Sequence, residues 1–419
     1  MAGLLLLLLC LLLLALRQNL IIILAAAVAY CYAVFGDGDL RGIVLDSWDT
    51  LNKDVLLSIP LYILAGNLMS RGAMAARLVR VMRALSGSIP GGLGIATVLS
   101  CALFAAVSGS GTVTLLAVGS VMYPALLQAG YSRRYAIGAL CAAGTLGILI
   151  PPSIPLILYG VMTQTSITDL FLAGILPGLL LTAIFAVYSG IHNRHLRGDP
   201  FDARELWAAL RDGFFALLMP VIILGGIYSG HFTATESAAV ALAYALLVEM
   251  LIYRQLKWRQ LYAVSVDTAQ NLGALFPVLM MAFALNMYLT YERLPEVFVS
   301  SMQQWIDSPT VFLLLTNAFL LLLGCVMDIG SAILIMAPLL EPLANAQGIN
   351  SVHFGIIMVM NLEIGYLTPP LGLNLIVAMG AFRESFAEIC KAVVPFVLLM
   401  LLGLLVVTFY PPIALALVQ

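Results

Sequence analysis

Apolar residues fill most of this chain in long segments that are separated by short polar stretches. A helix of about 20 apolar residues crosses a bilayer, and several of these segments reach that length. The pattern therefore predicts an all-α polytopic membrane protein. The apolar segments are residues 4–35, 55–70, 90–107, 112–128, 131–163, 168–190, 214–229, 233–253, 271–290, 310–328, 331–345, 351–382 and 392–418.

Two of these segments are interrupted by the same kind of motif. Residues 147–152 read Gly-Ile-Leu-Ile-Pro-Pro, and residues 365–370 read Gly-Tyr-Leu-Thr-Pro-Pro, 218 positions later (365 − 147). The same offset relates Gly130 to Gly348. Proline lacks an N–H group, so it leaves a carbonyl one turn earlier without its helical donor. Matched breaks in two halves of a membrane protein indicate the binding site of a secondary transporter.

The positive residues predict how the segments cross the membrane. The pairs 90–128 and 310–345 are expected to form re-entrant hairpins, and the N-terminus is expected in the cytoplasm. Fifteen of the 19 Lys and Arg then lie on the cytoplasmic side, where such residues concentrate. Only Arg41, Lys53 and Arg293 lie outside, and Arg17 falls within the first segment. Counting either hairpin as a single crossing would remove this bias.

This topology predicts two inverted repeats, because the two hairpins then start from opposite sides. The first repeat covers 1–190 and the second covers 214–419, with a polar cytoplasmic connector at 191–213 and a periplasmic C-terminus. Each repeat is expected to hold scaffold helices, one hairpin and one broken helix, the broken helices being 131–163 and 351–382.

Smaller features complete the expected architecture. Segments 71–86 and 254–268 alternate basic and apolar residues at helical spacing, which predicts amphipathic arm helices along the cytoplasmic interface. The first helix, 4–35, is expected to be uncleaved and interrupted around Arg17-Gln18-Asn19. The last helix is expected at 392–418.

The composition excludes several other classes of protein. The chain is 62% hydrophobic and 10% charged, which leaves too few charges to cover a soluble protein of 419 residues. A net charge of −2 argues against nucleic acid as a partner. The sequence has no Walker A, Gly-x-Ser-x-Gly or His-Glu-x-x-His motif, and its six Cys and four His form no metal pattern. We therefore expect no enzyme, no direct ATP drive and no cofactor.

The first hairpin turns at Ser108-Gly-Ser-Gly-Thr112 inside apolar sequence. Non-helical backbone at membrane depth is tolerated where it is buried or lines a cavity. Its hydroxyls and free carbonyls are suitable ligands for a small cation, as are the carbonyls of Gly147 and Ile150 freed by the proline break. The alternatives are a turn chosen for its shape and a proline kink used for packing.

The second half places acidic residues near the equivalent features. Asp328 aligns with Ser110 at the offset of 218, and Glu363 lies one turn before the second break. An ionisable residue inside a membrane is a functional-site hypothesis by default. Asp328 is thus a cation ligand, an acceptor behind the ligands or a helix cap, and Glu363 has a similar range of roles. Glu236, near the start of a helix, serves either as a cap or in transport.

Six stretches, taken in order, resemble the large membrane subunit of tripartite ATP-independent periplasmic (TRAP) transporters. They are Ile59–Met69, Phe104–Gly111, Gly147–Ile154, Phe232–Ala239, Met327-Asp328 and Gly365–Gly372. The resemblance covers nearly the whole chain. It implies a sodium-coupled importer of the bacterial inner membrane with an elevator mechanism. It also implies two partners: a periplasmic binding protein that delivers an organic acid anion, and a small four-helix membrane subunit.

The resemblance also implies site residues, with sodium as the only metal. The first sodium site would use Ser108, Ser110, Gly147, Ile150 and Pro151. The second would use Gly324, Gly365, Thr368 and Leu371, with Asp328 and Glu363 behind the ligands. Substrate would contact Ser110, Gly111, Thr112, Thr368 and Asn374.

Two departures from the family pattern stand out: Gly111 occupies a position that is often serine, and Arg17-Gln18-Asn19 replaces a Gly-x-Pro. Two rivals remain open, namely a stand-alone sodium-dicarboxylate or citrate carrier and a membrane-embedded enzyme or scaffold. The substrate itself is left open among dicarboxylates, sialic acid, other sugar acids, sulfonates and keto acids.

Overall fold

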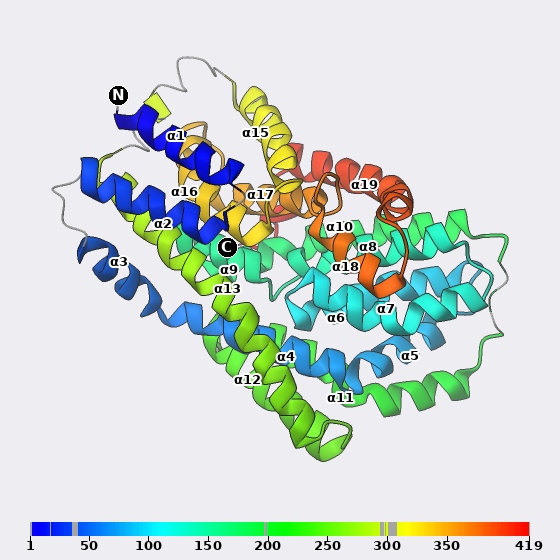
Figure 1. Ribbon diagram of the computed structural model, residues 1–419. Coiled ribbons are helices and arrows are strands. Elements are labelled where there is room, and N and C mark those ends of the chain that lie inside the picture. Colours follow the sequence, from blue (N-terminus) through cyan, green and yellow to red (C-terminus); the bar gives the residue numbers. More distant parts are fainter. Residues whose placement is uncertain are drawn as a thin grey trace.

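The computed structural model describes residues 2–16, 18–35, 41–196, 198, 200–293, 297, 299–300 and 308–418. Within these residues every regular element is a helix (Figure 1). The elements are α1 (Ala2–Ala15), α2 (Leu20–Tyr30), η1 (Cys31–Phe35), α3 (Arg41–Leu51), η2 (Asp54–Leu57), α4 (Ser58–Arg71), α5 (Met74–Ser86), α6 (Gly92–Ser108), α7 (Gly111–Gln128), α8 (Arg133–Leu149), α9 (Ile154–Thr163), α10 (Ile167–His192), α11 (Ala203–Tyr228), α12 (Ala234–Leu246), η3 (Leu247–Ile252), α13 (Trp258–Tyr291), α15 (Pro309–Gly324), α16 (Ile329–Ala346), α17 (Ser351–Gly365), α18 (Leu373–Phe382), α19 (Phe386–Phe409) and α20 (Pro412–Leu415).

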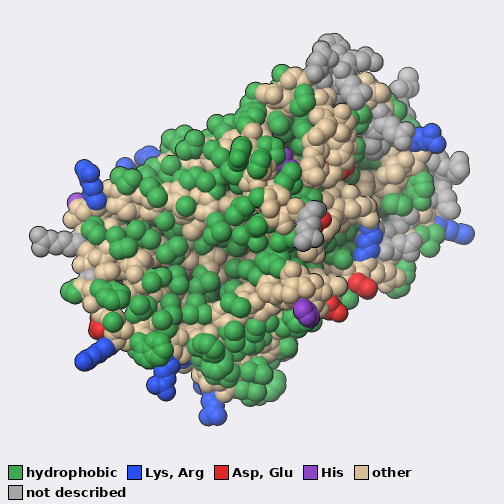
Figure 2. All heavy atoms as spheres, turned by 180° about the vertical axis from the view of Figure 1, so that it is seen from behind, with side chains coloured by type: hydrophobic (Ala, Val, Ile, Leu, Met, Phe, Trp, Pro, Cys, Tyr) green, Lys and Arg blue, Asp and Glu red, His purple; other side chains and the backbone are tan. Residues whose placement is uncertain are grey.

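The helices identify an all-helical, multi-span membrane protein. In the described part of the chain, eight helical segments are long and apolar enough to cross a membrane, or up to nine if the bent pair α4–α5 is one span. Figure 2 shows apolar side chains over much of one face of the molecule, with many of the charged side chains toward its edges. A broad exposed apolar surface of this kind is what lipid contact requires.

Two central helices, α8 and α17, form the middle of the core. Every residue from Tyr135 to Leu149 in α8 and from Val352 to Gly365 in α17 is buried. A helix that is buried on all sides must lie inside a bundle. Small residues permit close approach there: a Cβ on Gly138 would lie 2.2 Å from the Ala392 carbonyl oxygen of α19.

Both central helices end at the predicted breaks. In the first, Pro151 and Pro152 interrupt the backbone donors, and Ser153 caps the new helix α9 by accepting from Leu156 N at 3.3 Å. In the second, the chain leaves α17 after Gly365 and re-enters a helix after Gly372, which has a φ of +51°. The Pro-Pro bond is cis in both breaks.

The expected hairpin segments are also helix pairs. Helices α6 and α7 contact each other across a two-residue turn, and α15 contacts α16 across residues 325–328. In Figure 1 the cyan helices α6 and α7 lie between the blue α4 and α5 and the orange and red α18 and α19.

One prediction about the first segment is confirmed and one about the arms needs correction. The interruption expected around Arg17-Gln18-Asn19 separates α1 from α2, and Asn19 is extended there (φ −64°, ψ 145°); Arg17 itself lies outside the described residues. The expected arm 254–268 is not a separate helix. From Trp258 onward it continues into the following span as the single 34-residue helix α13, because no proline or tight turn interrupts residues 258–271.

The first predicted arm, 71–86, by contrast, is a separate helix, α5. Helices α4 and α5 meet at 67°, and the bend is held by Glu249 of η3, whose carboxylate accepts from Ala73 N and Met74 N at 2.8 Å each. A Cβ on Gly72 would lie 2.1 Å from the Glu249 carboxyl carbon, so glycine is required for this approach.

Two predicted boundaries also shift. The connector predicted at 191–213 is helical from Ala203 onward, because Asp202 caps α11 by accepting from Arg204 N at 2.8 Å. The last long helix, α19, starts at Phe386 rather than 392 and ends at Phe409, just before Pro411-Pro412. Proline pairs cannot supply the N–H groups that would continue the helix.

Candidate functional site

A cavity of about 270 Å³ is lined by both hairpin tips. The first tip contributes residues 109–113 and the second contributes residues 328–330. The other walls come from α4, α8, α9 and α13 and from Tyr366 beside the second break. Residues about 220 positions apart in the chain thus line one hollow.

The first tip is packed directly against the first helix break. A Cβ on Gly109, which has a φ of +60°, would lie 2.9 Å from the Pro152 carbonyl oxygen. A Cβ on Gly147 would lie 2.7 Å from the Ser110 carbonyl oxygen. Hydroxyls gather at the same place, since the Ser108 hydroxyl is 2.7 Å from that of Thr114.

The predicted residues of the first sodium site are therefore close neighbours at the tip and the break. The Ser110 hydroxyl lies 3.2 Å from that of Thr112, and both residues line the cavity. Ile150 and Pro151 belong to the same break, where they pack against Gly178 and Gly174 of α10.

Gly111 has a steric explanation. A Cβ at this position would lie 3.0 Å from Ile148 Cδ1 and 3.2 Å from Thr145 Cα. A serine would require the Ile148 side chain to shift by a few tenths of an ångström. Tight packing of the tip on α8 thus explains why position 111 has no serine hydroxyl.

The second tip and the second break meet in the same way. A Cβ on Gly365 would lie 2.5 Å from the Gly324 carbonyl carbon, and Leu371 N donates to the Cys325 carbonyl at 3.1 Å. The Thr368 hydroxyl donates to the Ile364 carbonyl at 2.8 Å. The four residues predicted for the second sodium site are thus all found at this junction.

The acidic residues have different surroundings. Asp328 lines the cavity and caps α16 by accepting from Ser331 N at 2.9 Å, so its capping role is confirmed. Glu363 is fully buried, and neither of its carboxyl oxygens has a hydrogen-bond partner among the described residues. Glu236 forms a capping box with Thr233, which confirms that it caps α12.

The cavity contains only part of the predicted substrate set. Ser110, Gly111 and Thr112 line it, whereas Thr368 and Asn374 do not. The Asn374 amide is buried and donates to the Cys141 carbonyl of α8 at 3.1 Å. Asn374 therefore links the second broken helix to the first.

Sequence reasoning missed three polar residues of the cavity: Asn67, Asn271 and Tyr366. Asn67 of α4 donates to the Thr268 hydroxyl of α13 at 3.0 Å and so joins the two helices that form one wall. The available signal was an amide side chain inside an otherwise apolar segment. Among the described residues, no group of three or more His, Cys, Asp and Glu could hold a metal, so a cation here would rely on hydroxyl and carbonyl oxygens.

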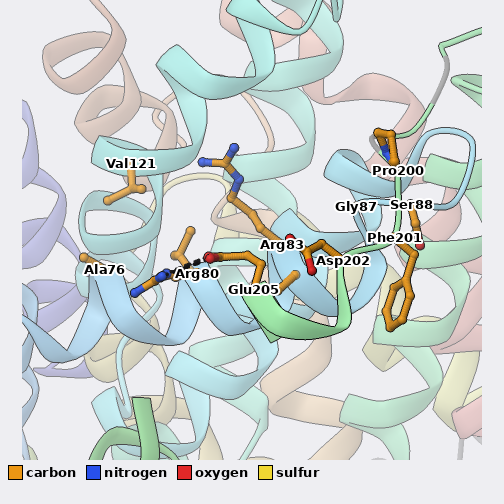
Figure 3. A pocket seen from close by; sticks show the side chains of 12 residues that line it. Ala76, Arg80, Arg83, Gly87, Ser88, Val121, Pro200, Phe201, Asp202 and Glu205 are labelled. Atoms are coloured by element: carbon orange, nitrogen blue, oxygen red, sulfur yellow. Dashed lines mark hydrogen bonds and ion pairs between the residues drawn. The ribbon is translucent and has the colours of Figure 1, made fainter. Parts of the chain in front are cut away.

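A larger hollow of about 460 Å³ lies elsewhere, between α5 and the start of α11 (Figure 3). Its Arg80 is already paired, with Nε 2.8 Å from Glu205 Oε1 and Nη1 3.4 Å from Asp212 Oδ2. The hollow touches neither the hairpin tips nor the helix breaks. It is therefore the smaller cavity at the tips that has the features of a transport site.

Comparison with known proteins agrees with this geometry. Residues 5–413 match the family "Tripartite ATP-independent periplasmic transporter, DctM component". The chain belongs to this family. It is a TRAP transporter permease of the bacterial inner membrane and not an enzyme.

Two relatives and one solved structure indicate how far the similarity extends. The permease is 40% identical to the "C4-dicarboxylate TRAP transporter large permease protein DctM" of Pseudomonas aeruginosa, over 92% of this chain and 91% of that protein. It is 37% identical to the "Isethionate TRAP transporter permease protein DctMQ" of Oleidesulfovibrio alaskensis, over 88% of this chain and 58% of that protein. The YdaH transporter of Alcanivorax borkumensis matches with a TM-score of 0.68 at 15% identity, over 90% of each chain, which shows a shared fold.

Proposed function

We propose that this permease imports a small organic acid anion together with sodium, after a periplasmic binding protein delivers the anion. The observation that carries the proposal is the cavity shared by the two hairpin tips, each tip lying against a helix break. Hydroxyl and carbonyl oxygens are the ligands that hard cations prefer. The relatives named for C4-dicarboxylate and isethionate support an anionic substrate.

The two sodium sites follow from the two junctions. Site one is Ser108 and Ser110 with the carbonyls of Gly147, Ile150 and Pro151. Site two is Gly324, Gly365, Thr368 and Leu371. The anion binds between the tips, at Ser110, Gly111 and Thr112, where helix α7 begins. The free N–H groups of a helix N-terminus favour a negative charge.

Transport proceeds by an elevator mechanism, in which the hairpin and the broken helix of each repeat move together against a scaffold. The moving unit is 90–163 with 310–382, and the scaffold is 4–70, 168–253 and 392–418. The walls of the cavity support this division, because α4 of the scaffold lines the same cavity as the two tips. A bifunctional cross-link between cysteines placed at Asn67 and Thr112 is expected to stop uptake. Full turnover by the cross-linked protein would contradict the movement.

The orientation and partners follow the same scheme. The N-terminus lies in the cytoplasm and the C-terminus in the periplasm. A small four-helix membrane subunit braces the scaffold, which is supported by the relative named DctMQ, a protein longer than this chain.

Uptake by proteoliposomes tests the function. The permease is co-purified with its small subunit and given a radiolabelled C4-dicarboxylate or isethionate, with and without a sodium gradient and the cognate binding protein. Uptake is expected only when both are present. Uptake that needs sodium but no binding protein would favour a stand-alone carrier. No uptake with either anion under full conditions would contradict the substrate class.

A further inference from the structure

A hollow of about 520 Å³ opens beside the start of α11, remote from the transport cavity. Three arginines line it, Arg77 from α5 and Arg204 and Arg211 from α11, together with Trp207 and Tyr253. Arg204, Trp207 and Arg211 are spaced i, i+3 and i+7, so they share one face of the helix. The hollow therefore combines positive charge with an amphipathic aromatic ring.

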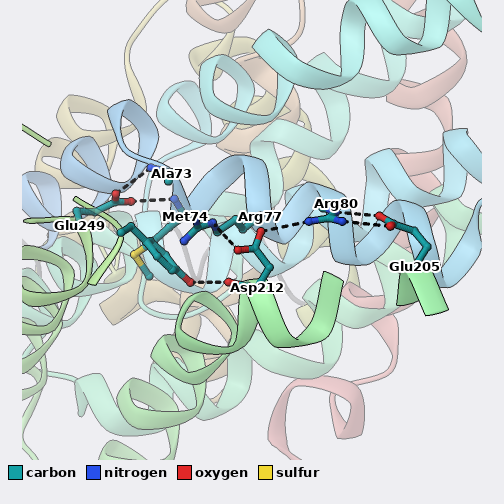
Figure 4. Close-up of polar contacts among 8 residues, drawn as sticks. Ala73, Met74, Arg77, Arg80, Glu205, Asp212 and Glu249 are labelled. Carbon is teal, nitrogen blue, oxygen red and sulfur yellow. Dashed lines mark hydrogen bonds and ion pairs between the residues drawn. The ribbon is translucent and has the colours of Figure 1, made fainter. Parts of the chain in front are cut away.

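The positive charge of the hollow is only partly balanced. Arg77 Nε lies 3.4 Å from Asp212 Oδ1, and Asp212 is also contacted by Arg80 (Figure 4). Arg77 Nη1 has no hydrogen-bond partner in the described part of the chain. Arg204 and Arg211 are exposed and form no ion pair with any described residue. Two free guanidinium groups are thus available to an anion.

The same helix face continues as an apolar stripe. Trp207 is 72% exposed, Phe214 is 55% exposed and Val221 is 64% exposed, at successive intervals of seven residues. The neighbouring η3 adds Leu251, which is 67% exposed, and η3 lies beside this part of α11 because the Tyr253 hydroxyl donates to the Asp212 carbonyl at 3.0 Å. A stripe that ends in arginines and a tryptophan is typical of a membrane–water interface.

We propose that this hollow binds the phosphate headgroup of an anionic phospholipid, whose acyl chains lie along the stripe. Guanidinium groups bind phosphate oxygens in a planar, two-pronged geometry. A basic pocket at the cytoplasmic end of membrane helices is a known kind of lipid headgroup site. Under the orientation proposed above, in which most Lys and Arg lie in the cytoplasm, this end of α11 is cytoplasmic.

Native mass spectrometry of the purified, delipidated full chain tests the proposal. Phosphatidylglycerol is expected to bind more tightly than phosphatidylcholine with the same acyl chains. The double variant Arg204→Gln/Arg211→Gln should bind phosphatidylglycerol about tenfold more weakly or worse, because hydrogen bonds to charged groups are strong. The control Arg194→Gln/Arg259→Gln also removes two positive charges, but from exposed positions outside the hollow. It should bind phosphatidylglycerol like the wild type.

A charge-preserving variant distinguishes loss of the binding site from misfolding of the protein. Arg204→Lys/Arg211→Lys should keep the preference for phosphatidylglycerol, although with weaker binding, because lysine retains charge but not the planar fork. Three results would overturn the proposal: equal binding of the two lipids by the wild type, a double Gln variant that binds like the control, or loss of lipid binding in millimolar inorganic phosphate. The last result would identify a site for a soluble anion.

Discussion

Gly324 and Gly365 meet backbone against backbone: a Cβ added to Gly365 would lie 2.5 Å from both the Cα and the carbonyl carbon of Gly324. This contact joins the second hairpin to the second helix break. Neither backbone can yield easily, because Gly324 ends α15 and Gly365 ends α17. The second proposed sodium site therefore depends on two residues without side chains.

Gly365→Ala is expected to lower the free energy of unfolding by about 1–3 kcal/mol, the usual effect of overpacking a core. Thermal unfolding in detergent measures this. Gly380→Ala is the matched control, since a Cβ at Gly380 of α18 meets nothing within 4 Å. Equal melting temperatures for the two variants would contradict the contact.

Ser110→Ala should raise the sodium concentration for half-maximal uptake about five- to tenfold. It removes one hydroxyl ligand whose net contribution is about 1 kcal/mol. Ser120→Ala, within α7, the helix that Ser110 precedes, is the control, since the Ser120 hydroxyl donates to the Ala117 carbonyl and Ser120 does not line the cavity. Uptake is measured against sodium concentration. An unchanged sodium curve for Ser110→Ala would remove this residue from site one.

Thr368→Val tests site two in the same assay. The substitution keeps the side-chain volume but removes a hydroxyl that donates to the Ile364 carbonyl at 2.8 Å. Thr97→Val makes the same change in α6, where the Thr97 hydroxyl donates to the Leu93 carbonyl at 2.8 Å. Only Thr368→Val is expected to raise the sodium concentration for half-maximal uptake. The same sodium curve for both variants would mean that the Thr368 hydroxyl serves the helix alone.

Asp328→Asn separates the two roles of this carboxylate. Asparagine caps helices as well as aspartate does, so the melting temperature should stay close to that of the wild type. Asp328→Ala also removes the acceptor for Ser331 N and should lower the free energy of unfolding by about 1 kcal/mol. Both variants remove the carboxylate charge from the cavity and should lose uptake. Wild-type uptake by Asp328→Asn would show that Asp328 acts only as the N-cap of α16.

Glu249→Ala should disrupt the bend between α4 and α5. It leaves Ala73 N and Met74 N without their acceptors, each a hydrogen bond to a charged group that contributes about 1.5–3 kcal/mol. Glu249→Gln retains one acceptor oxygen and should be less destabilising. Thermal unfolding ranks the variants, and a melting temperature for Glu249→Ala equal to that of the wild type would contradict the role of Glu249 at the bend.

Local chemistry was enough to predict the helix breaks and the hairpin segments. A Pro-Pro pair removes two consecutive donors, and the breaks lie at Pro151-Pro152 and Pro369-Pro370, whereas single prolines such as Pro177 lie inside continuous helices. The apolar segments on either side then predicted α6–α9 and α15–α18 to within a few residues. The prediction of a separate second arm was wrong because a change in surface polarity, unlike a proline pair, does not end a helix. Residues 258–268 therefore continue into α13.

The sequence by itself determined that this is a polytopic helical membrane protein of the TRAP permease family, because hydropathy, proline positions and family motifs are all local properties. Only the tertiary structure decided which residues share the cavity. Asn67 lies on α4, Asn271 on α13 and Asp328 at the N-cap of α16, and no pattern along the chain predicts that the three line one cavity. It also decided that Asn374 turns away to the Cys141 carbonyl, because a buried amide takes the nearest acceptor and that acceptor belongs to the other repeat.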